Sequence, residues 1–380
     1  MNNIPRTVSF SGGLLDRMKR EGLSEQMQNS LREKAENYLS SPLYAVTERM
    51  TRAVSGNPHD YCSIGTYWWP NPSTENGLPY IRRDGYTTPA AEDPITYDAM
   101  TEKAFTLALA AYYLDEPKYA DAAEKALYDW HLNPETYMTP HAEYSQAIPG
   151  ICSGRGIGII DFSMRSYRVY DAIAILKYLG KITEAREAEY VAWYNKFTDW
   201  MLTSENGLEE ECELNNHGTY FDVHLLATAI FTERPALIKK VCTTAYERRL
   251  LSQIEPDGSQ PLELARTMAM IYSLSNLWAY SLISNMAASQ GYAKYWDKNS
   301  KFGDSAIKKA VDFLYPYYEH PETFPYEEIK FEGVHIAMAR MLSVLDARFK
   351  VEGYGDKARA IIEAHADKNN LPEWLFYPLK

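Results

Sequence analysis

The chain has 380 residues, of which 46% are hydrophobic and 24% are charged, a balance typical of globular proteins with a large core. Lys and Arg number 39 against 51 Asp and Glu, which gives a formal net charge of −12. Because nucleic-acid-binding proteins usually carry a basic face, this charge argues against a nucleic-acid partner. The sequence contains no run of about 18 apolar residues, so we expect no membrane span.

Apolar residues recur at helical spacing over most of the chain, whereas the two-residue alternation of strands is weak. No internal repeat of about 20 to 50 residues is visible. Helices joined by short turns, such as those at Gly180 and Gly291, predict stacked antiparallel hairpins. We therefore expect an all-α fold, an (α/α) toroid formed by a single domain over 1–380. In chain order, the helical pattern covers 99–114, 169–176, 183–203, 216–231, 236–252, 261–289, 304–317, 332–346 and 356–366.

Two long segments, 54–96 and 131–160, interrupt the helical pattern. Loops of this length in a compact domain are usually functional or disordered. Both segments are rich in aromatic and apolar residues, which disordered segments lack. We expect them to cover one mouth of the toroid and to wall a cleft.

The four cysteines are scattered and show no Cys-x-x-Cys spacing, so a zinc site is not expected. The sequence leaves open whether the thiols are free or paired. We expect neither a metal nor a cofactor. The cysteines are Cys62, Cys152, Cys212 and Cys242.

Four polar side chains lie in otherwise apolar helical segments and form the candidate catalytic set. Asn216 and His217 begin the segment 216–231, and Arg266 and Tyr272 lie in 261–289. An amide, an imidazole, a guanidinium and a phenol are costly to bury unless each has a partner. Their presence there favours a functional site.

Taken singly, these residues also have structural explanations. Asn216, or the preceding Asn, could cap the helix that follows, which is a favoured role for Asn. His217 and Tyr272 could be ordinary core residues. Arg266 could pair with Glu263 one turn earlier on the same helix face. On one continuous helix, Arg266 and Tyr272 would project roughly 120° apart, so they could share a site only if a substrate lay across that helix.

Together, the four residue types match the demands of β-elimination on a uronate polymer. The C5 proton leaves only when the adjacent carboxylate is neutralised, and amide and imidazole donors near a guanidinium can do this without a metal. A phenol beside a guanidinium can then remove the C5 proton and protonate the leaving O4. We expect an anionic polysaccharide as the substrate.

Several motifs resemble the alginate lyase superfamily of helical-toroid polysaccharide lyases, and within it polysaccharide lyase family 38 most of all. The likeness spans about 60–280. Its motifs are Tyr67-Trp-Trp-Pro-Asn-Pro72, Gly77-Leu-Pro-Tyr-Ile-Arg-Arg-Asp84, Ile148-Pro-Gly150, Gly154-Arg-Gly-Ile-Gly-Ile-Ile-Asp161, Glu213-Leu-Asn-Asn-His217 and Gln260-Pro-Leu-Glu-Leu-Ala-Arg266, with Tyr272 downstream.

This resemblance implies an (α/α) barrel of about six to seven helix pairs that cleaves alginate or glucuronan. It implies that Asn216 and His217 neutralise the carboxylate. Tyr272 would transfer the protons, with Arg266 as its support. β-D-Mannuronate and β-D-glucuronate place H5 and O4 on one face, so we expect these sugars to be preferred, with guluronate as a secondary substrate.

A second group of residues could bind the polymer. Arginines could supply the local positive field that the net charge lacks, aromatic rings could stack on sugar faces, and two polar side chains could bind hydroxyls. Surface solvation or loop packing is the alternative for each of them. The candidates are Arg82, Arg83, Arg155 and Arg165, then Tyr67, Trp68, Trp69 and Tyr80, and finally Gln146 and His141.

Two other function classes remain open at this stage. An (α/α)-barrel glycoside hydrolase would use two carboxylates about 5 to 10 Å apart, and a glycan-binding protein would need the aromatic residues alone. The acidic candidates for a hydrolase are Asp161, Asp222 and the run Glu209, Glu210 and Glu211, which we expect to be a solvated loop. The residues that follow Met1 show no basic-then-apolar leader, so we expect a protein that is either cytoplasmic or has had its signal peptide removed. Because polymers are met outside the cytoplasm, we expect a periplasmic or secreted protein whose signal peptide has been removed.

Overall fold

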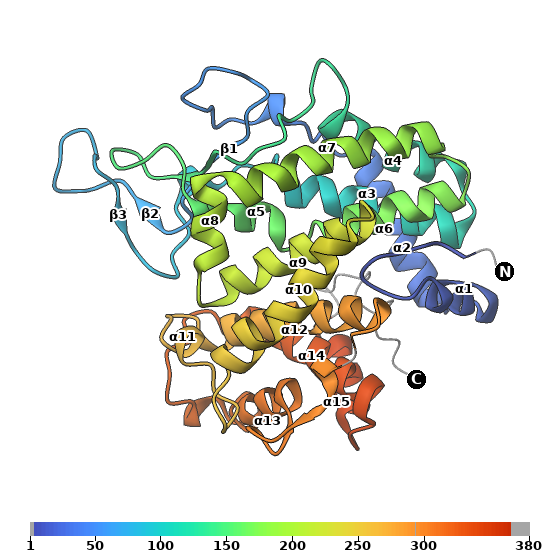
Figure 1. The fold of residues 1–380 in the computed structure, drawn as a ribbon, viewed down its shortest axis with the longest axis vertical. Coiled ribbons are helices and arrows are strands. Elements are labelled where there is room, and N and C mark those ends of the chain that lie inside the picture. The colour runs from blue at the N-terminus through green and yellow to red at the C-terminus, as the bar shows by residue number, and fades with distance from the viewer. Residues whose placement is uncertain (1–3, 293, 366–380) are drawn as a thin grey trace. The chain divides into compact units, whose positions relative to one another are not determined.

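The computed structural model describes residues 4–292 and 294–365, and most of this length is helical (Figure 1). The contacts divide the chain into two compact units. The first comprises Met1–Cys212 and Ala227–Arg234, and the second comprises Glu213–Leu226 and Pro235–Lys380. Helix α9 (Asn216–Phe231) therefore contributes residues to both units. The expectation of a single catalytic domain stays a prediction.

The first unit is built around α3, which is buried along most of its length. Thr96 begins this helix, since its hydroxyl accepts a hydrogen bond from the Ala99 backbone N–H at 3.0 Å. Helices α3, α4 and α6 pack against one another. The helices of this unit are α1 (Gly12–Glu21), α2 (Glu25–Leu39), α3 (Tyr97–Leu114), α4 (Pro117–His131), α5 (Ile160–Ser163), α6 (Tyr167–Tyr178), α7 (Glu184–Thr203) and α8 (Glu205–Cys212).

The two long segments of the first unit contain short strands, together with single 3₁₀ turns at Pro89–Ala91 and Gly156–Ile159. Strand β1 (Cys62–Ile64) pairs in parallel with β4 (Tyr144–Ala147), which joins the two segments directly. Strand β2 (Trp68–Trp69) pairs antiparallel with β3 (Ile81–Arg82). Gly154 is required here, because a Cβ at this position would lie 1.9 Å from the Glu143 carbonyl oxygen. The role of these segments in walling a cleft stays a prediction.

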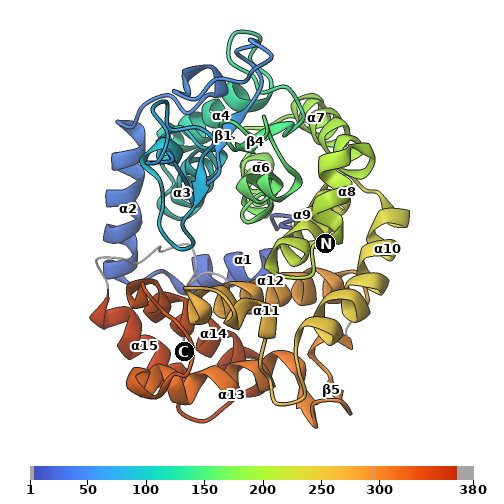
Figure 2. The ribbon, with the colours of Figure 1, turned by 90° about the vertical axis from the view of Figure 1, so that its left-hand side faces the viewer.

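The second unit has α12 as its buried centre, and α12, α13 and α14 pack against one another (Figure 2). Residues 236–252 do not form one regular helix, because α10 ends at Ala245 and a π-helical turn follows over Tyr246–Leu251. The remaining elements are α10 (Pro235–Ala245), α11 (Pro261–Leu264), α12 (Ala269–Ser289), β5 (Lys298–Asn299), β6 (Asp304–Ser305), α13 (Ala306–Glu319), α14 (Val334–Phe349) and α15 (Tyr354–Ala364).

The expectation of one helix over 261–289 is wrong, because the chain leaves the helical conformation between α11 and α12. Met268 has φ −127° and ψ 59° and forms a bridge with Glu328. The Glu328 carboxylate accepts the backbone N–H groups of Met270 at 2.9 Å and Ile271 at 3.1 Å. It thus satisfies donors that the first turn of a helix leaves without a helical partner. These bonds set the start of α12 at Ala269.

Most of the other predicted helices are confirmed, including 99–114, 183–203 and 216–231. The predicted helices do not include α1, α2, α4, α5 and α8. Helices α1 and α2 bury only two residues each, so their apolar stripe is narrow. Within the described residues, no helix combines the length and the apolar character that a membrane crossing needs.

Candidate active site

The start of α9 separates the roles of two consecutive asparagines. Asn215 precedes the helix, and its side-chain oxygen accepts the His217 backbone N–H at 2.9 Å. This is the capping role that Asn favours. Asn216 therefore does not serve as the cap, and its amide is available for another contact.

The Asn216 amide is held by a buried carboxylate. The Asn216 backbone N–H donates to Oε1 of Glu263 at 2.6 Å, and its Nδ2 donates to Oε2 at 2.7 Å. Asn216 is 3% exposed and Glu263 is 1% exposed. Burial raises the pKa of Glu263, while the two hydrogen bonds and the charges of His217 and Arg266 oppose that rise.

Arg266 and Tyr272 meet because the helix is broken between them. Nη2 of Arg266 donates to the Tyr272 hydroxyl at 3.3 Å, and the guanidinium carbon lies 4.3 Å from the ring centroid. Both side chains are only partly buried. The separation expected on a continuous helix does not apply, since Arg266 lies in the break and Tyr272 in the first turn of α12. A substrate need not lie across a helix to reach both residues.

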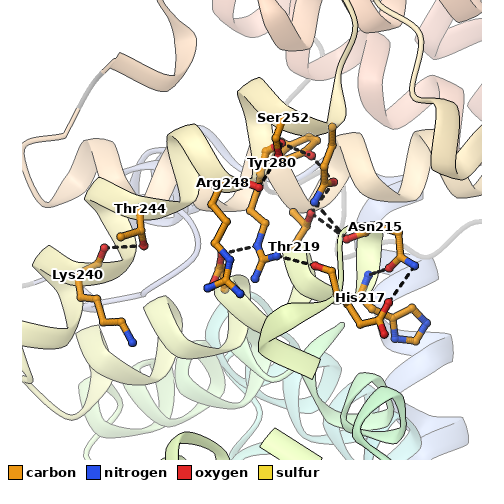
Figure 3. A network of polar contacts seen from close by, with 12 residues as sticks. Asn215, His217, Thr219, Lys240, Thr244, Arg248, Ser252 and Tyr280 are labelled. Carbon is orange, nitrogen blue, oxygen red and sulfur yellow. Dashed lines mark hydrogen bonds and ion pairs between the residues drawn. The ribbon is translucent and has the colours of Figure 1, made fainter. Parts of the chain in front are cut away.

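A network of polar side chains from the second unit contacts the residues at the start of α9 (Figure 3). Arg249, which is fully buried, donates to the Asp222 carboxylate at 2.8 Å and to the Glu213 carbonyl at 2.6 Å. The Tyr280 hydroxyl donates to Gln253 at 2.6 Å. Gln253 in turn donates to the carbonyl oxygen of the capping Asn at 3.3 Å. The His217 ring lies at the edge of this network and projects away from it (Figure 3). The network fixes the backbone from which His217 projects.

In the first unit, Gln146 and Arg155 are in direct contact. Arg155 donates to the Gln146 carbonyl at 3.0 Å and to its side-chain oxygen at 2.9 Å. The Gln146 side chain donates to Asp161 at 3.0 Å, and Asp161 also accepts the Ser63 hydroxyl at 2.5 Å. Gln146 has φ +50°, a strained value for a residue other than Gly. These bonds hold Gln146 and Arg155 in one arrangement, and burial lowers the pKa of Arg155.

The β2–β3 hairpin carries most of the predicted aromatic candidates. The Arg83 guanidinium stacks 4.6 Å from the Trp69 ring centroid, and that of Arg155 lies 5.9 Å from Trp68. Arg82 is exposed and donates to Asp84 at 2.7 Å. The two tryptophans, together with Tyr67 and Tyr80, are half-buried. The hairpin therefore presents partly exposed rings beside cationic side chains.

The remaining polar candidates have partners of their own. His141 lies 3.3 Å from the Asp60 carboxylate, and Arg165 lies 3.1 Å from Asp98. The acidic run 209–211 is not a solvated loop, because it belongs to α8 and Glu210 is fully buried. Consecutive residues of a helix project about 100° apart, so Glu210 can face the protein interior while Glu209 and Glu211 do not.

A family profile described as Alginate lyase matches residues 46–324. The chain belongs to the alginate lyase family. The expectation of an enzyme, a polysaccharide lyase, is thereby confirmed. Among curated proteins, no sequence matches this lyase.

Solved structures extend the likeness to nearly the whole lyase. A crystal structure of an alginate lyase from Bacteroides ovatus has 32% identity and a TM-score of 0.90, and the match covers 99% of this chain and 100% of that chain. Alginate lyase A1-III from Sphingomonas species A1 has 15% identity and a TM-score of 0.55, over 89% and 92% of the two chains. A variant of A1-III complexed with a tetrasaccharide has 16% identity and the same TM-score, over 88% and 91%. The expected all-α fold of the (α/α)-toroid class is confirmed by these matches.

Sequence reasoning missed the contact between Glu263 and Asn216. The spacing of one helical turn indicates Arg266 as a partner of Glu263 and gives no sign of Asn216. The available signal was an acidic residue between two leucines, Leu262 and Leu264, where burial of a carboxylate requires a strong partner.

Proposed function

We propose that this lyase cleaves 1,4-linked uronate polymers, mannuronate-rich alginate or glucuronan, and that it belongs to polysaccharide lyase family 38. The reaction is a β-elimination that leaves a 4,5-unsaturated uronate at the new non-reducing end. The observation that carries the proposal is the contact of the Arg266 guanidinium with the Tyr272 hydroxyl at 3.3 Å. A partly exposed phenol held by a fixed cation is suited to losing and regaining a proton.

The proposal assigns a residue to each step of the β-elimination. Asn216 and His217 donate hydrogen bonds to the sugar carboxylate, which withdraws charge from C5 and makes its proton removable. Tyr272, as the phenolate favoured by Arg266, takes the C5 proton. The C4–O4 bond then breaks while the C4–C5 double bond forms, and Tyr272 returns the proton to O4. No proton is gained or lost overall.

Stereochemistry supports the proposed substrates. In β-D-mannuronate and β-D-glucuronate, H5 and O4 leave from one face, so a single phenol can serve both (syn elimination). In α-L-guluronate the C5 configuration is inverted, and His217 would have to act as the base. Guluronate is therefore the secondary substrate in this proposal.

Neutral donors make the proposed reaction independent of a metal, since the Asn216 amide and the His217 imidazole do the work of a Lewis acid. In the first unit, Arg155 and the β2–β3 hairpin supply positive charge and aromatic surface for the polymer, consistent with stacking on sugar rings. A polymeric substrate of this kind lies outside the cytoplasm. We therefore place the enzyme in the periplasm or the secreted fraction.

The experiment compares wild type with Tyr272→Phe on polymannuronate, polyguluronate and glucuronan. A lyase produces a double bond conjugated with the carboxylate, which absorbs in the ultraviolet. A hydrolase produces reducing ends without this absorbance, and a binding protein produces neither. We expect Tyr272→Phe to lose turnover and to retain binding of the polymer. A near-normal rate in this variant would remove Tyr272 from the mechanism.

A further inference from the structure

The carboxylate of Glu263 is buried and is in contact with the candidate catalytic set. It is 1% exposed, and its two oxygens accept from the backbone and the side chain of one residue, Asn216. Because both oxygens face Asn216 donors, Glu263 is poorly placed to act as a base. Its contacts indicate that it positions Asn216.

Both oxygens of Glu263 accept hydrogen bonds from Asn216, whereas an amide can present either a donor or an acceptor. Glu263 therefore forces Asn216 to turn Nδ2, and not Oδ1, towards it. One of the two Nδ2 protons is then used, and the other remains for a further acceptor. A sugar carboxylate is such an acceptor.

Glu263 also connects Asn216 with the pair formed by Arg266 and Tyr272. The backbone carbonyl of Glu263 accepts the Arg266 N–H at 3.1 Å, and Arg266 contacts Tyr272. Helix α11 is only four residues long, so the position of Arg266 depends on this single turn. Glu263 thus holds Asn216 by its side chain and Arg266 by its backbone.

We propose that Glu263 is a positioning residue that locks the Asn216 amide with a donor directed at the substrate carboxylate. This inference rests on the proposed function of Asn216 in neutralising that group. Glu263 itself does not touch the sugar.

The test is Glu263→Gln, which preserves shape and removes the negative charge. The Gln oxygen accepts the Asn216 backbone N–H, so its NH2 group faces the Asn216 side chain. Two donors cannot face each other, and the Asn216 amide must flip. Where the wild type presents an N–H to the substrate, the variant presents a lone pair of Oδ1. Losing one such donor costs roughly 100-fold to 1,000-fold in kcat. We expect a loss of this order, with KM changed by less than about threefold.

Asp312→Asn is the matched control, because it makes the same chemical change in the second unit. Asp312 accepts from Lys308 at 2.7 Å and from Tyr354 at 3.0 Å, and neither partner belongs to the candidate catalytic set. We expect its kcat and KM to equal those of wild type. If both variants lose turnover in proportion to a lowered melting temperature, Glu263 has a structural role only and the proposal is wrong.

A second measurement does not depend on turnover. In protein labelled with 15N-asparagine, the side-chain signal of residue 216 is identified by its loss in Asn216→Ala. We expect its bonded proton to resonate downfield and exchange slowly in wild type, and to lose both properties in Glu263→Gln. An unchanged signal, or a changed signal with kcat within threefold of wild type, overturns the proposal. If wild type releases no unsaturated product from any uronate polymer, the proposed function fails, and the amide signal still shows whether Glu263 holds Asn216.

Discussion

The substitution Asp171→Asn should remove a pH dependence of stability from the first unit. Asp171 lies on α6 and is fully buried, and it accepts the backbone N–H groups of Val8 at 2.5 Å and Ser9 at 3.2 Å. The Ser9 hydroxyl also donates to it. Burial raises the pKa of Asp171 from 3.8 to about 7, against the opposing effect of these bonds and of the Arg168 charge.

The direction in which stability changes with pH follows from the proton that the folded protein binds on Asp171. Between pH 3.8 and about 7 the folded protein holds a proton on Asp171 that the unfolded chain has lost. The stabilisation is therefore complete below pH 3.8 and is lost as the pH rises through about 7. At about 1.36 kcal/mol per pH unit, its upper limit is about 4 kcal/mol. Between about pH 5 and pH 8, roughly 2.5 kcal/mol of this should disappear.

The assay is urea unfolding of wild type and Asp171→Asn at about pH 5 and pH 8, followed by intrinsic fluorescence. Asn keeps one acceptor oxygen but turns an NH2 group towards the donors of Val8 and Ser9. The variant should therefore be less stable than wild type at the lower pH and show a smaller change between the two. An equal pH dependence in both proteins would refute the assignment of a titrating Asp171.

Three other perturbations address the site. Arg266→Lys keeps the charge but loses the planar contact with Tyr272, so kcat should fall about 10-fold to 100-fold with little change in KM in a continuous ultraviolet assay. An unaltered kcat would show that charge alone suffices. Gly218→Ala would bring a Cβ within 2.2 Å of the Glu213 carbonyl oxygen and 2.4 Å of Nη1 of Arg249. We expect a lower melting temperature by calorimetry and loss of activity, and a stable, active variant would contradict the close packing at the start of α9. Prolonged dialysis against EDTA should leave turnover unchanged, and restoration of a lost rate by a divalent cation would disprove a metal-independent reaction.

The candidate set could be predicted from the sequence because its residue types are unusual in apolar helices. Asn216, His217, Arg266 and Tyr272 lie in segments whose helical period is clear, and the predicted helix over 216–231 is confirmed as α9. The contact between Arg266 and Tyr272 could not be predicted in the same way. It depends on a helix break set by Glu328, about 60 residues away in sequence, and local periodicity carries no information about such a contact.

Burial of charged groups was the other feature that the sequence concealed. Glu210 belongs to an acidic run that looks exposed, and the spacing of Glu263 and Arg266 gives no sign of the contact between Glu263 and Asn216. Glu263 is buried where the donors of Asn216 are in place, and such tertiary contacts override the preference of a carboxylate for water. A buried acid can be anticipated from apolar flanks, but its partner is fixed only by the fold.

The break between α11 and α12 has a consequence for how this enzyme can diverge. In an uninterrupted helix, one inserted residue rotates everything that follows by about 100° and would separate guanidinium from phenol. The irregular stretch between Leu264 and Ala269 uncouples the two helices instead, because loops absorb insertions without turning the elements that they join. A residue added between the arginine and the tyrosine would therefore leave α12 in place and preserve their contact.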